Sequence, residues 1–215
     1  MTLDKLINQI DSSKPLVICD VDEVLINLLD PLRLFLDGHD YTIDITSHNF
    51  GRTIKKRGCG SPIDAEDIPH LVDIFFDACI DKLPFYAGAL EALQILEKES
   101  QVMILTNLPH KFGDRRRQHL KKSGIDYPLI TNEGGKGPIV KHLADAINKQ
   151  VIFIDDTPSH HGSVAKHAPN VHRLHLIAHP ELAAAVPIAE HAHERIDSWQ
   201  MATPHILNIL RRDYP

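Results

Sequence analysis

The chain has 215 residues, of which 43% are hydrophobic and 24% are charged. This composition is typical of a soluble globular protein and excludes disordered, collagen-like and low-complexity classes. The formal net charge of -6 argues against general attraction to a phosphate backbone, so we expect no nucleic-acid partner. No stretch approaches 18 consecutive apolar residues, so we expect no membrane-spanning segment.

Cysteine usage and the first residues bear on the compartment. Cys19, Cys59 and Cys79 are few, odd in number and widely spaced. They predict neither a disulfide framework nor a thiolate zinc site. The first 14 residues carry acids among apolar residues and lack the basic segment and apolar run of a signal peptide. We therefore expect a cytoplasmic protein.

Apolar runs of strand length recur along the chain. An amphipathic helix predicted over residues 3–10 leads into the first run, at 15–19. Similar runs follow at 102–105 and 151–154, and a weaker one at 174–177. Continuous apolar strands are typical of a parallel sheet that is covered on both faces.

Amphipathic segments alternate with these strands. Helices are predicted over 88–99, 111–123 and 138–148. Beyond the last strand the chain is predicted to be helical, with Pro187 interrupting one helix and Thr203-Pro204 starting the final one. Strands that alternate with helices imply βαβ crossovers, so the predicted fold class is α/β, with a three-layer, Rossmann-like parallel sheet.

Residues 27–83 separate the first strand from the second by far more than one crossover helix requires. We interpret this segment as an insertion with its own small core, placed as a mainly helical cap on the sheet. The predicted division is then a core domain of residues 1–26 and 84–215 and a cap domain of residues 27–83.

Three elements are expected inside the insertion. Asp30 and Pro31 predict the N-cap and first residue of a helix that stops at Gly38. The apolar alternation at 43–45 is compatible with a short strand or a hairpin. A continuous apolar stripe over 68–83, which includes two phenylalanines, predicts a helix whose stripe packs in a core rather than stacking on a ligand.

Polar side chains follow the predicted strands at the edge where open α/β sheets bind ligands. They are Asp20 and Asp22 after the first strand, Thr106 and Asn107 after the second, and Asp155 and Asp156 after the third. Carboxylates at about 4 Å repel by about 4 kcal/mol per pair at an effective dielectric of 20, so such a cluster needs a cation or protonation. An all-oxygen site of this kind suits Mg²⁺.

The spacing of two of these carboxylates has a chemical use. If the chain leaves the strand between them, Asp20 can face a substrate as nucleophile while Asp22 reaches the leaving group as general acid and base. Thr106 offers a hydroxyl for a phosphate oxygen. Lys136, just before a predicted helix, can place one positive charge on the same phosphate.

The ordered motifs DVDEV at 20–24, LTN at 105–107, Lys136 and IDD at 154–156 resemble those of the haloacid dehalogenase superfamily of phosphohydrolases. The resemblance covers residues 15 to about 177. It implies that Asp20 forms an aspartyl-phosphate and that Asp22 is the general acid and base.

The same resemblance assigns the phosphate and metal contacts. It implies that Thr106 and Lys136 hold the phosphoryl group. It also implies that Mg²⁺ is held by Asp20, Asp156, the backbone carbonyl of Asp22 and Asp155. The position of the insertion, between the first and second motifs, is similar to that of the family's mainly helical cap.

Two features depart from the family pattern or qualify it. Glu23 stands where the family most often has Gly. Lys141 is a second candidate lysine, and Lys136 is preferred because it starts the predicted helix. The family's dehalogenases do not use a second Asp at the position of Asp22, so phosphoryl chemistry is favoured over dehalogenation.

Basic residues suggest how a substrate would be read. Those of the insertion are Arg52, Lys55, Lys56 and Arg57. A cap closes over its substrate, so we expect Arg52 and Lys55, together with Asn107 of the second motif, to contact an anionic substrate. The run at 115–117 is interpreted instead as a solvated helix face.

The 15 histidines raise the question of a second metal site. His191 and His193 would diverge on a helix, and His175 and His179 have useful spacing only if their segment is not a strand. A zinc site is therefore not favoured. His160 or His161, just after the third motif, is expected at the rim of the site.

These observations predict a cytoplasmic, Mg²⁺-dependent phosphatase of a small phosphorylated metabolite, acting as a monomer or a homodimer. One alternative is a phosphomutase or phosphotransferase, which would pass the phosphoryl group to a second hydroxyl. Another is a non-catalytic regulatory protein that retains Mg²⁺ binding.

Overall fold

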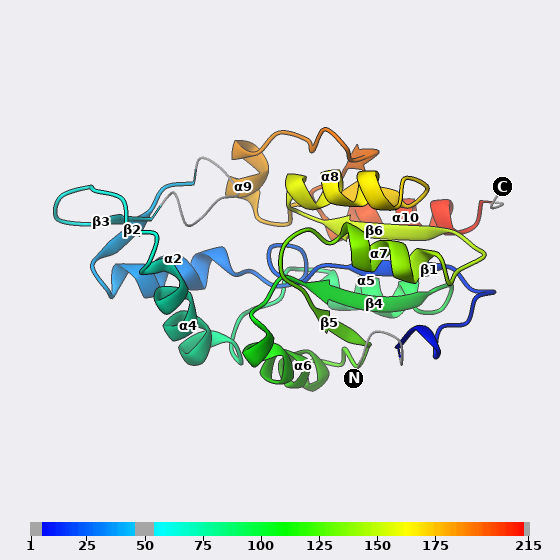
Figure 1. Ribbon diagram of the computed structural model, residues 1–215, viewed down its shortest axis with the longest axis horizontal. Coiled ribbons are helices and arrows are strands. Elements are labelled where there is room, and N and C mark those ends of the chain that lie inside the picture. Colours follow the sequence, from blue (N-terminus) through cyan, green and yellow to red (C-terminus); the bar gives the residue numbers. More distant parts are fainter. Residues whose placement is uncertain (1–5, 46–53, 213–215) are drawn as a thin grey trace.

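The computed structural model describes residues 6–45 and 54–212 and has a six-stranded parallel sheet at its centre (Figure 1). The strand order is β5-β4-β1-β6-β7-β8. The strands are β1 (Leu16–Cys19), β4 (Gln101–Thr106), β5 (Leu129–Thr131), β6 (Val151–Asp155), β7 (His172–His175) and β8 (Glu194–Arg195). The predicted α/β fold class with a Rossmann-like sheet is confirmed.

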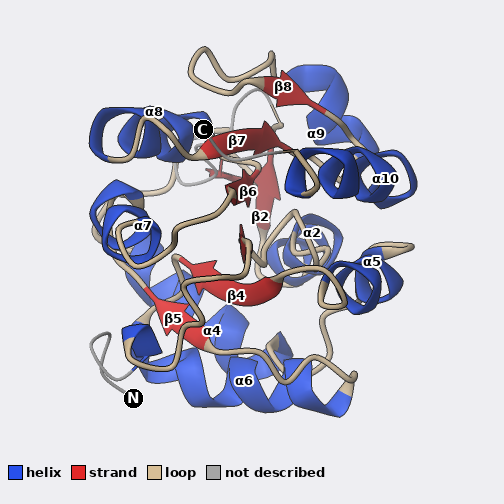
Figure 2. Ribbon diagram, turned by 90° about the vertical axis from the view of Figure 1, so that its right-hand side faces the viewer, coloured by secondary structure: helices blue, strands red, loops and turns tan. Residues whose placement is uncertain are grey.

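Helices cover both faces of the sheet (Figure 2). The helices that follow β1 and the insertion are α5 (Ala89–Leu96), α6 (Gly113–Lys122), α7 (Gly137–Ala144), α8 (Pro158–His167), α9 (Pro180–Ala185) and α10 (Trp199–Leu210), with the short 3-10 helix η1 (His110–Phe112) before α6. Helices α7 and α8 lie on one face, and α5 and α10 on the other. Within the described residues, no helix is both long and apolar enough to cross a bilayer.

Two hydrophobic clusters explain why the strands are apolar throughout. Leu16 and Ile18 of β1 pack in the cluster under α7 and α8, whereas Val17 and Cys19 pack in the one under α5 and α10. Side chains alternate between the faces of a strand, so a strand with helices on both sides buries every residue. All four β1 residues are fully buried.

The order of the strands determines where a ligand can bind. If the six strands of this sheet are numbered 1 to 6 in the order in which the chain reaches them, their order across the sheet is 3-2-1-4-5-6. This is the doubly wound pattern, and its reversal lies between β1 and β6. Ligands bind in such sheets outside the carboxyl ends of the strands at this reversal. The residues that follow β1 and end β6 are therefore the centre of the candidate site.

Residues 27–83 form α2 (Leu29–Asp37), the strands β2 (Tyr41–Ile43) and β3 (Ile54–Lys56), and α4 (Ile68–Cys79). In Figure 1 these elements lie to the left of the sheet. Strands β2 and β3 pair antiparallel, which confirms the hairpin alternative. Phe35 of α2 packs edge-on against Phe75 of α4, with ring centroids 5.5 Å apart.

The prediction of a separate core for this segment is wrong. Leu32, Ile54 and Phe75 belong to the same buried cluster as Val17 of β1 and Leu93 of α5. The apolar stripe of α4 therefore continues the core of the sheet. The division into a core domain and a cap domain stays a prediction.

The first helix of the insertion starts earlier than predicted. It begins at Leu29 rather than after Asp30, and it ends before Gly38 as expected. The reason is a cap supplied from outside the segment, because the Glu23 carboxylate accepts the backbone N–H groups of Leu28 and Leu29 at 2.9 and 2.7 Å. The sequence around Asp30 does not reveal this cap.

Other bounds also differ from the prediction. Strand β7 covers 172–175 rather than 174–177, because the chain leaves the sheet and Ile177 packs against Leu29 in a third small cluster. Strands β5 and β8 were not predicted, and at three and two residues they are too short to show a pattern. The helix predicted over 3–10 lies partly outside the described residues, with residues 6 and 7 helical.

The C-terminal helices differ in the same way. Helix α10 begins at Trp199 rather than at Thr203, because Ser198 caps it by accepting the N–H of Met201. Pro204 therefore lies inside the helix. Pro187 follows the end of α9 and interrupts no helix.

Candidate active site

Asp20 lies where β1 ends at the reversal of the sheet. Its backbone N–H donates to the Ile154 carbonyl of β6 at 2.9 Å, which joins the two strands at this edge. The side chain is buried, with the residue 6% exposed. Burial raises the pKa of Asp20 to about 7, while Lys136 acts to lower it and Asp155 adds to the rise.

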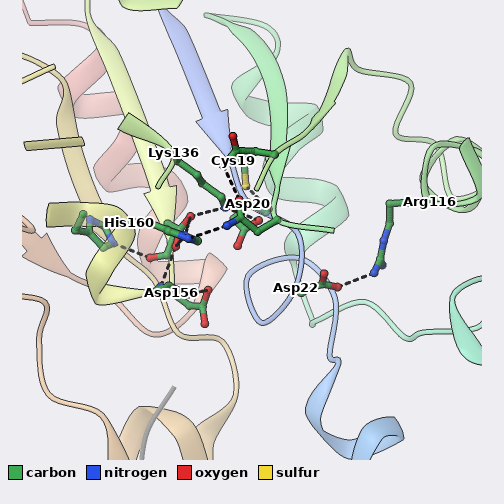
Figure 3. Close-up of polar contacts among 12 residues, drawn as sticks. Cys19, Asp20, Asp22, Arg116, Lys136, Asp156 and His160 are labelled. Atoms are coloured by element: carbon green, nitrogen blue, oxygen red, sulfur yellow. Dashed lines mark hydrogen bonds and ion pairs between the residues drawn. The ribbon is translucent and has the colours of Figure 1, made fainter. Parts of the chain in front are cut away.

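Lys136 stands at the N-cap of α7 and is completely buried. Its Nζ lies 2.8 Å from Asp20 Oδ1 (Figure 3) and 2.6 Å from Asp155 Oδ2, so one ammonium group joins two carboxylates from neighbouring strands. Burial alone would lower the pKa of Lys136, but these two carboxylates raise it above its usual value. The lysine is charged at neutral pH.

A close helix–helix approach places this lysine. A Cβ at Gly137, the first residue of α7, would lie 2.2 Å from the Ser163 carbonyl of α8. Only glycine therefore allows α7 to start this near to α8. The Gly137 N–H donates to Ser163 Oγ at 2.9 Å, which fixes the residue next to Lys136.

Asp155 is the last residue of β6 and has no exposed surface. Besides Lys136, it accepts the Thr157 N–H at 2.9 Å and lies 3.0 Å from His160 Nδ1. Although burial disfavours its charge, Lys136 and His160 hold the pKa of Asp155 well below its usual range. Asp155 is thus an ionised carboxylate that orients the lysine and the histidine.

The carboxylates fit a divalent cation. Oxygens of Asp20, Asp155 and Asp156 lie within 4.8 Å of one another. Asp20 and Asp156 are the better placed ligands, because they line the cavity, whereas Asp155 lies behind it and contacts Lys136, His160 and the Thr157 N–H. Mg²⁺ typically takes one or two protein carboxylates and keeps several waters, which matches this donor set.

Asp22 lies apart from that group. Its Oδ1 accepts from Nη2 of Arg116 at 2.7 Å, and Figure 3 shows the side chain pointing toward this arginine. Arg116 comes from α6, has no exposed surface and lies with its guanidinium 5.9 Å from the ring centroid of Phe76. Burial raises the pKa of Asp22, and the Arg116 charge opposes that rise.

Glu23, the departure from the family pattern, links the site to the insertion. Its backbone φ is 64°, a left-handed conformation that favours glycine. The carboxyl group is buried, caps α2 and accepts from the Tyr86 hydroxyl at 2.5 Å. Burial raises the pKa of Glu23 to about 8, against the effect of the Tyr86 hydrogen bond. Glu23 thus joins the start of the insertion to the chain that returns from it.

Thr106 and Asn107 border the site at the end of β4. Thr106 is the last residue of the strand and is buried. The Asn107 amide donates to the Gly134 carbonyl at 2.7 Å and lies 3.1 Å from His160 Nε2. Asn107 therefore holds the loop that leads to Lys136 rather than standing alone.

These residues surround a cavity of about 200 Å³. It is lined by Asp20, Asp22, Glu23, Leu28, Phe76, Thr106, Asn107, Asp156, Thr157 and His160. Five predicted site residues are therefore brought together around one cavity, with Lys136 and Asp155 buried behind Asp20. His160 lies at the rim as one alternative predicted.

Two predicted residues lie away from the cavity lining, and a third is not described. Arg52 lies outside the described residues. Lys55 is on β3, where it pairs with Asp44 at 3.3 Å, so the structure places it on a neighbouring carboxylate and not in the lining of the cavity. His161 is buried, with Nε2 2.9 Å from the Asp155 carbonyl, so it is not a rim residue.

The sequence interpretation missed Arg116. It treated residues 115–117 as one solvated face, but Arg116 is fully buried while Arg117 is exposed. A signal was present, because Phe112 and Leu120 are apolar and lie four residues before and after Arg116, on the same helix face.

Solved structures of haloacid dehalogenase-like hydrolases share this fold. One, from Streptococcus pneumoniae, is 12% identical, with a TM-score of 0.62 over 91% of this chain and 99% of its own. Another, from Deinococcus radiodurans, is 16% identical, with a TM-score of 0.63 over 94% and 100%, and holds phosphate and sodium. A provisionally assigned phosphoglycolate phosphatase from Lactobacillus plantarum is 18% identical, with a TM-score of 0.59 over 92% and 99%.

No protein-family profile and no curated protein sequence matches the chain. The likeness is therefore one of structure, and it extends over nearly the whole chain. It confirms the fold that the resemblance implies: this is a protein with the haloacid dehalogenase-like hydrolase fold.

Proposed function

We propose that this protein is a Mg²⁺-dependent phosphatase of a small phosphorylated metabolite. The observation that carries the proposal is the convergence of Asp20, Lys136, Asp155, Asp156 and Thr106 at the reversal of a doubly wound sheet. A cavity of about 200 Å³ suits a phosphoryl group with a small body rather than a folded protein.

Asp20 is the proposed nucleophile. Attack on phosphorus needs its ionised form, which the Lys136 ammonium favours at 2.8 Å. The reaction forms a bond from the Asp20 carboxylate to phosphorus and breaks the bond from phosphorus to the leaving oxygen. Bound Mg²⁺, held by Asp20 and Asp156, would supply positive charge that offsets the phosphoryl oxygens.

Asp22 is the proposed general acid and base. It would protonate the leaving oxygen and then take a proton from the water that hydrolyses the aspartyl-phosphate. In this structure its carboxylate is bound to Arg116, so the side chain has to turn from the arginine toward the cavity for this step. Thr106 and Lys136 would hold the phosphoryl group, and Asn107 and His160 border it.

The experiment is phosphate release from a panel of small phosphorylated metabolites, with and without Mg²⁺. We expect Mg²⁺-dependent release from the native protein and a loss of at least about 10⁴-fold in Asp20→Asn, which removes the nucleophile. Asp145→Asn, a change at an exposed carboxylate on the far end of α7, is the matched control and should leave release unchanged. Full release by Asp20→Asn would overturn the mechanism.

A phosphomutase is the second candidate. Two of the similar structures, from Bacteroides vulgatus and Thermotoga maritima, are provisionally assigned as β-phosphoglucomutases, at 15% and 16% identity. A mutase would use the same aspartyl-phosphate and pass it to a second hydroxyl, so an isomerised phosphoester in place of free phosphate would favour it. Mg²⁺ binding without turnover of any phosphoester would favour the non-catalytic alternative.

A further inference from the structure

A second cluster of metal-ligating side chains lies beside β7 and β8, the last two strands of the sheet. It is formed by His172 of β7, Glu194 of β8 and His205 of α10. His172 Nε2 lies 2.6 Å from one Glu194 oxygen, and His205 Nε2 lies 2.5 Å from the other. The potential ligand atoms of all three residues lie within 4.8 Å of one another.

This cluster is separate from the candidate active site. Asp155 pairs in register with His175, and His172 precedes His175 by three residues along β7. At about 3.3 Å per residue, His172 lies about 10 Å along the strand from the level of Asp155, toward the amino ends of the strands. The three residues line no part of the cavity around Asp20.

The donor set is that of a zinc-type metal rather than of Mg²⁺. Two imidazoles and one carboxylate match Zn²⁺ and other first-row ions, whereas Mg²⁺ prefers oxygen ligands alone. Nε2 of His205 is buried and lies against the Glu194 carboxylate at 2.5 Å, so both nitrogens of the cluster face the same carboxylate. A metal ion that replaced the protons between these atoms would be bound by all three side chains.

The surroundings hold the ligands in place and leave access. The His172 ring stacks on His193, with centroids 4.8 Å apart and planes at 13°. His193 is itself fixed, because its Nδ1 accepts the Arg173 N–H at 2.9 Å. The side chains of His172, Glu194 and His205 are 18%, 27% and 34% exposed, so an ion and a water can reach the cluster.

We propose that His172, Glu194 and His205 bind one Zn²⁺-class ion, with water as the fourth ligand. The ion ties α10 to strands β7 and β8. Tetrahedral zinc with bonds of about 2.0–2.2 Å separates its ligand atoms by about 3.3 Å, so the side chains need to move apart by only about 1 Å. The ion lies outside the cavity around Asp20, so it takes no part in the proposed phosphoryl reaction.

The test uses the full chain after removal of metals, in excess Mg²⁺ so that the active-site carboxylates are not available to zinc. Bound zinc is counted after Zn²⁺ addition and gel filtration, and Tm is measured in parallel. We expect one zinc per chain above any background, and a Tm rise of about 5–10 °C at free Zn²⁺ of about 100 times Kd.

The variants His172→Gln, Glu194→Gln and His205→Gln should each lose that zinc and the Tm rise, with Mg²⁺-dependent activity retained. His142→Gln, at an exposed histidine of α7, is the matched control and should keep both. The proposal is overturned if the three variants bind as much zinc as the native protein. It is also overturned if Zn²⁺ leaves Tm unchanged, since the cluster is then a carboxylate hydrogen-bonded to two histidines and nothing more.

Discussion

Acidic and basic side chains pair at the sheet edge and in residues 27–83, but in very different surroundings. The side chains of Lys136, Asp155 and Asp20 are 0%, 0% and 8% exposed. The Lys56–Asp64 pair on the insertion has side chains that are 43% and 72% exposed. The same kinds of charged groups are buried at the sheet edge and exposed to solvent in residues 27–83.

The difference teaches which of these pairs matter to the protein. Solvated pairs gain little because water screens them, and their typical value is about 0–1 kcal/mol. A buried pair is costly to assemble and strongly destabilising to break, because the remaining charge stays in a poorly polarisable interior. The buried charges at the sheet edge therefore indicate a catalytic role rather than a stabilising one.

The largest expected effect comes from the buried lysine. Lys136→Met leaves Asp20 and Asp155 without their shared cation, so we expect the free energy of unfolding to fall by about 3–5 kcal/mol. Phosphate release should fall by at least about 10²-fold, because one positive charge is lost from the phosphoryl site. Urea unfolding and a phosphate assay measure the two effects.

Lys141→Met is the matched control, five residues along the same chain segment. Lys141 pairs with Asp145 in an exposed i,i+4 contact at 2.9 Å, so its loss should cost less than about 0.5 kcal/mol. Equal effects of the two lysine changes would show that burial does not separate the two regions.

The next effect concerns Glu23, at the junction of the two regions. Its pKa is raised to about 8 in the folded state, against 4.5 in an unfolded chain, so the folded state binds one more proton between these values. The free energy of unfolding therefore falls as pH rises from 5 to 8, with a contribution of the order of 4 kcal/mol at about 1.4 kcal/mol per unit.

The variant Glu23→Gln should remove that contribution and flatten the stability profile, because glutamine stays neutral in both states. Urea unfolding at pH 5, 6.5 and 8 measures the slope. The pKa of Asp20 is also raised, so Asp20 also lowers the free energy of unfolding as pH rises. This contribution is the same in the native protein and in Glu23→Gln, so it cancels when the two slopes are compared. An unchanged slope in Glu23→Gln would mean that Glu23 is ionised in the folded protein.

Neighbouring arginines of α6 extend the comparison. Arg116→Met should cost about 2–3 kcal/mol, because it leaves Asp22 unpaired in a site only 20% exposed. Arg115→Met should cost much less than Arg116→Met, since its contacts with Asp77 and Asp81 are partly solvated. The double variant Asp22→Asn/Arg116→Met should recover most of the loss, because no uncompensated charge remains. Failure to recover would show that the arginine acts through packing.

The sequence predicted the site residues that follow strands. The apolar runs locate the strand ends, and a doubly wound sheet brings the ends of β1, β4 and β6 together. The sequence alone therefore predicts that Asp20, Thr106 and Asp156 lie close together, and all three line one cavity. The sequence could also predict Lys136, because this residue stands at the start of a helix.

The rest depends on contacts between residues far apart in the chain. Arg116 reaches Asp22 across 94 positions, and Glu23 caps a helix whose own residues offered another start. The cluster of His172, Glu194 and His205 comes from three elements, two of which are a short strand and a helix with a misplaced start. Local periodicity contains no information on such pairings, so no pattern could have predicted them.

The smallest expected effect tests whether strand β3 of the insertion acts on the substrate. Lys55→Met removes an exposed pair with Asp44, so stability should change by less than about 0.5 kcal/mol. KM should also stay unchanged if the protein works as the structure shows, because Lys55 lies outside the cavity lining. Steady-state kinetics on the best substrate measure this, with Lys98→Met on the sheet region as the control.

A rise in KM of several-fold in Lys55→Met alone would contradict this expectation. It would mean that the basic strand β3 moves onto the bound substrate during turnover, and the predicted cap would then be a working part of the enzyme.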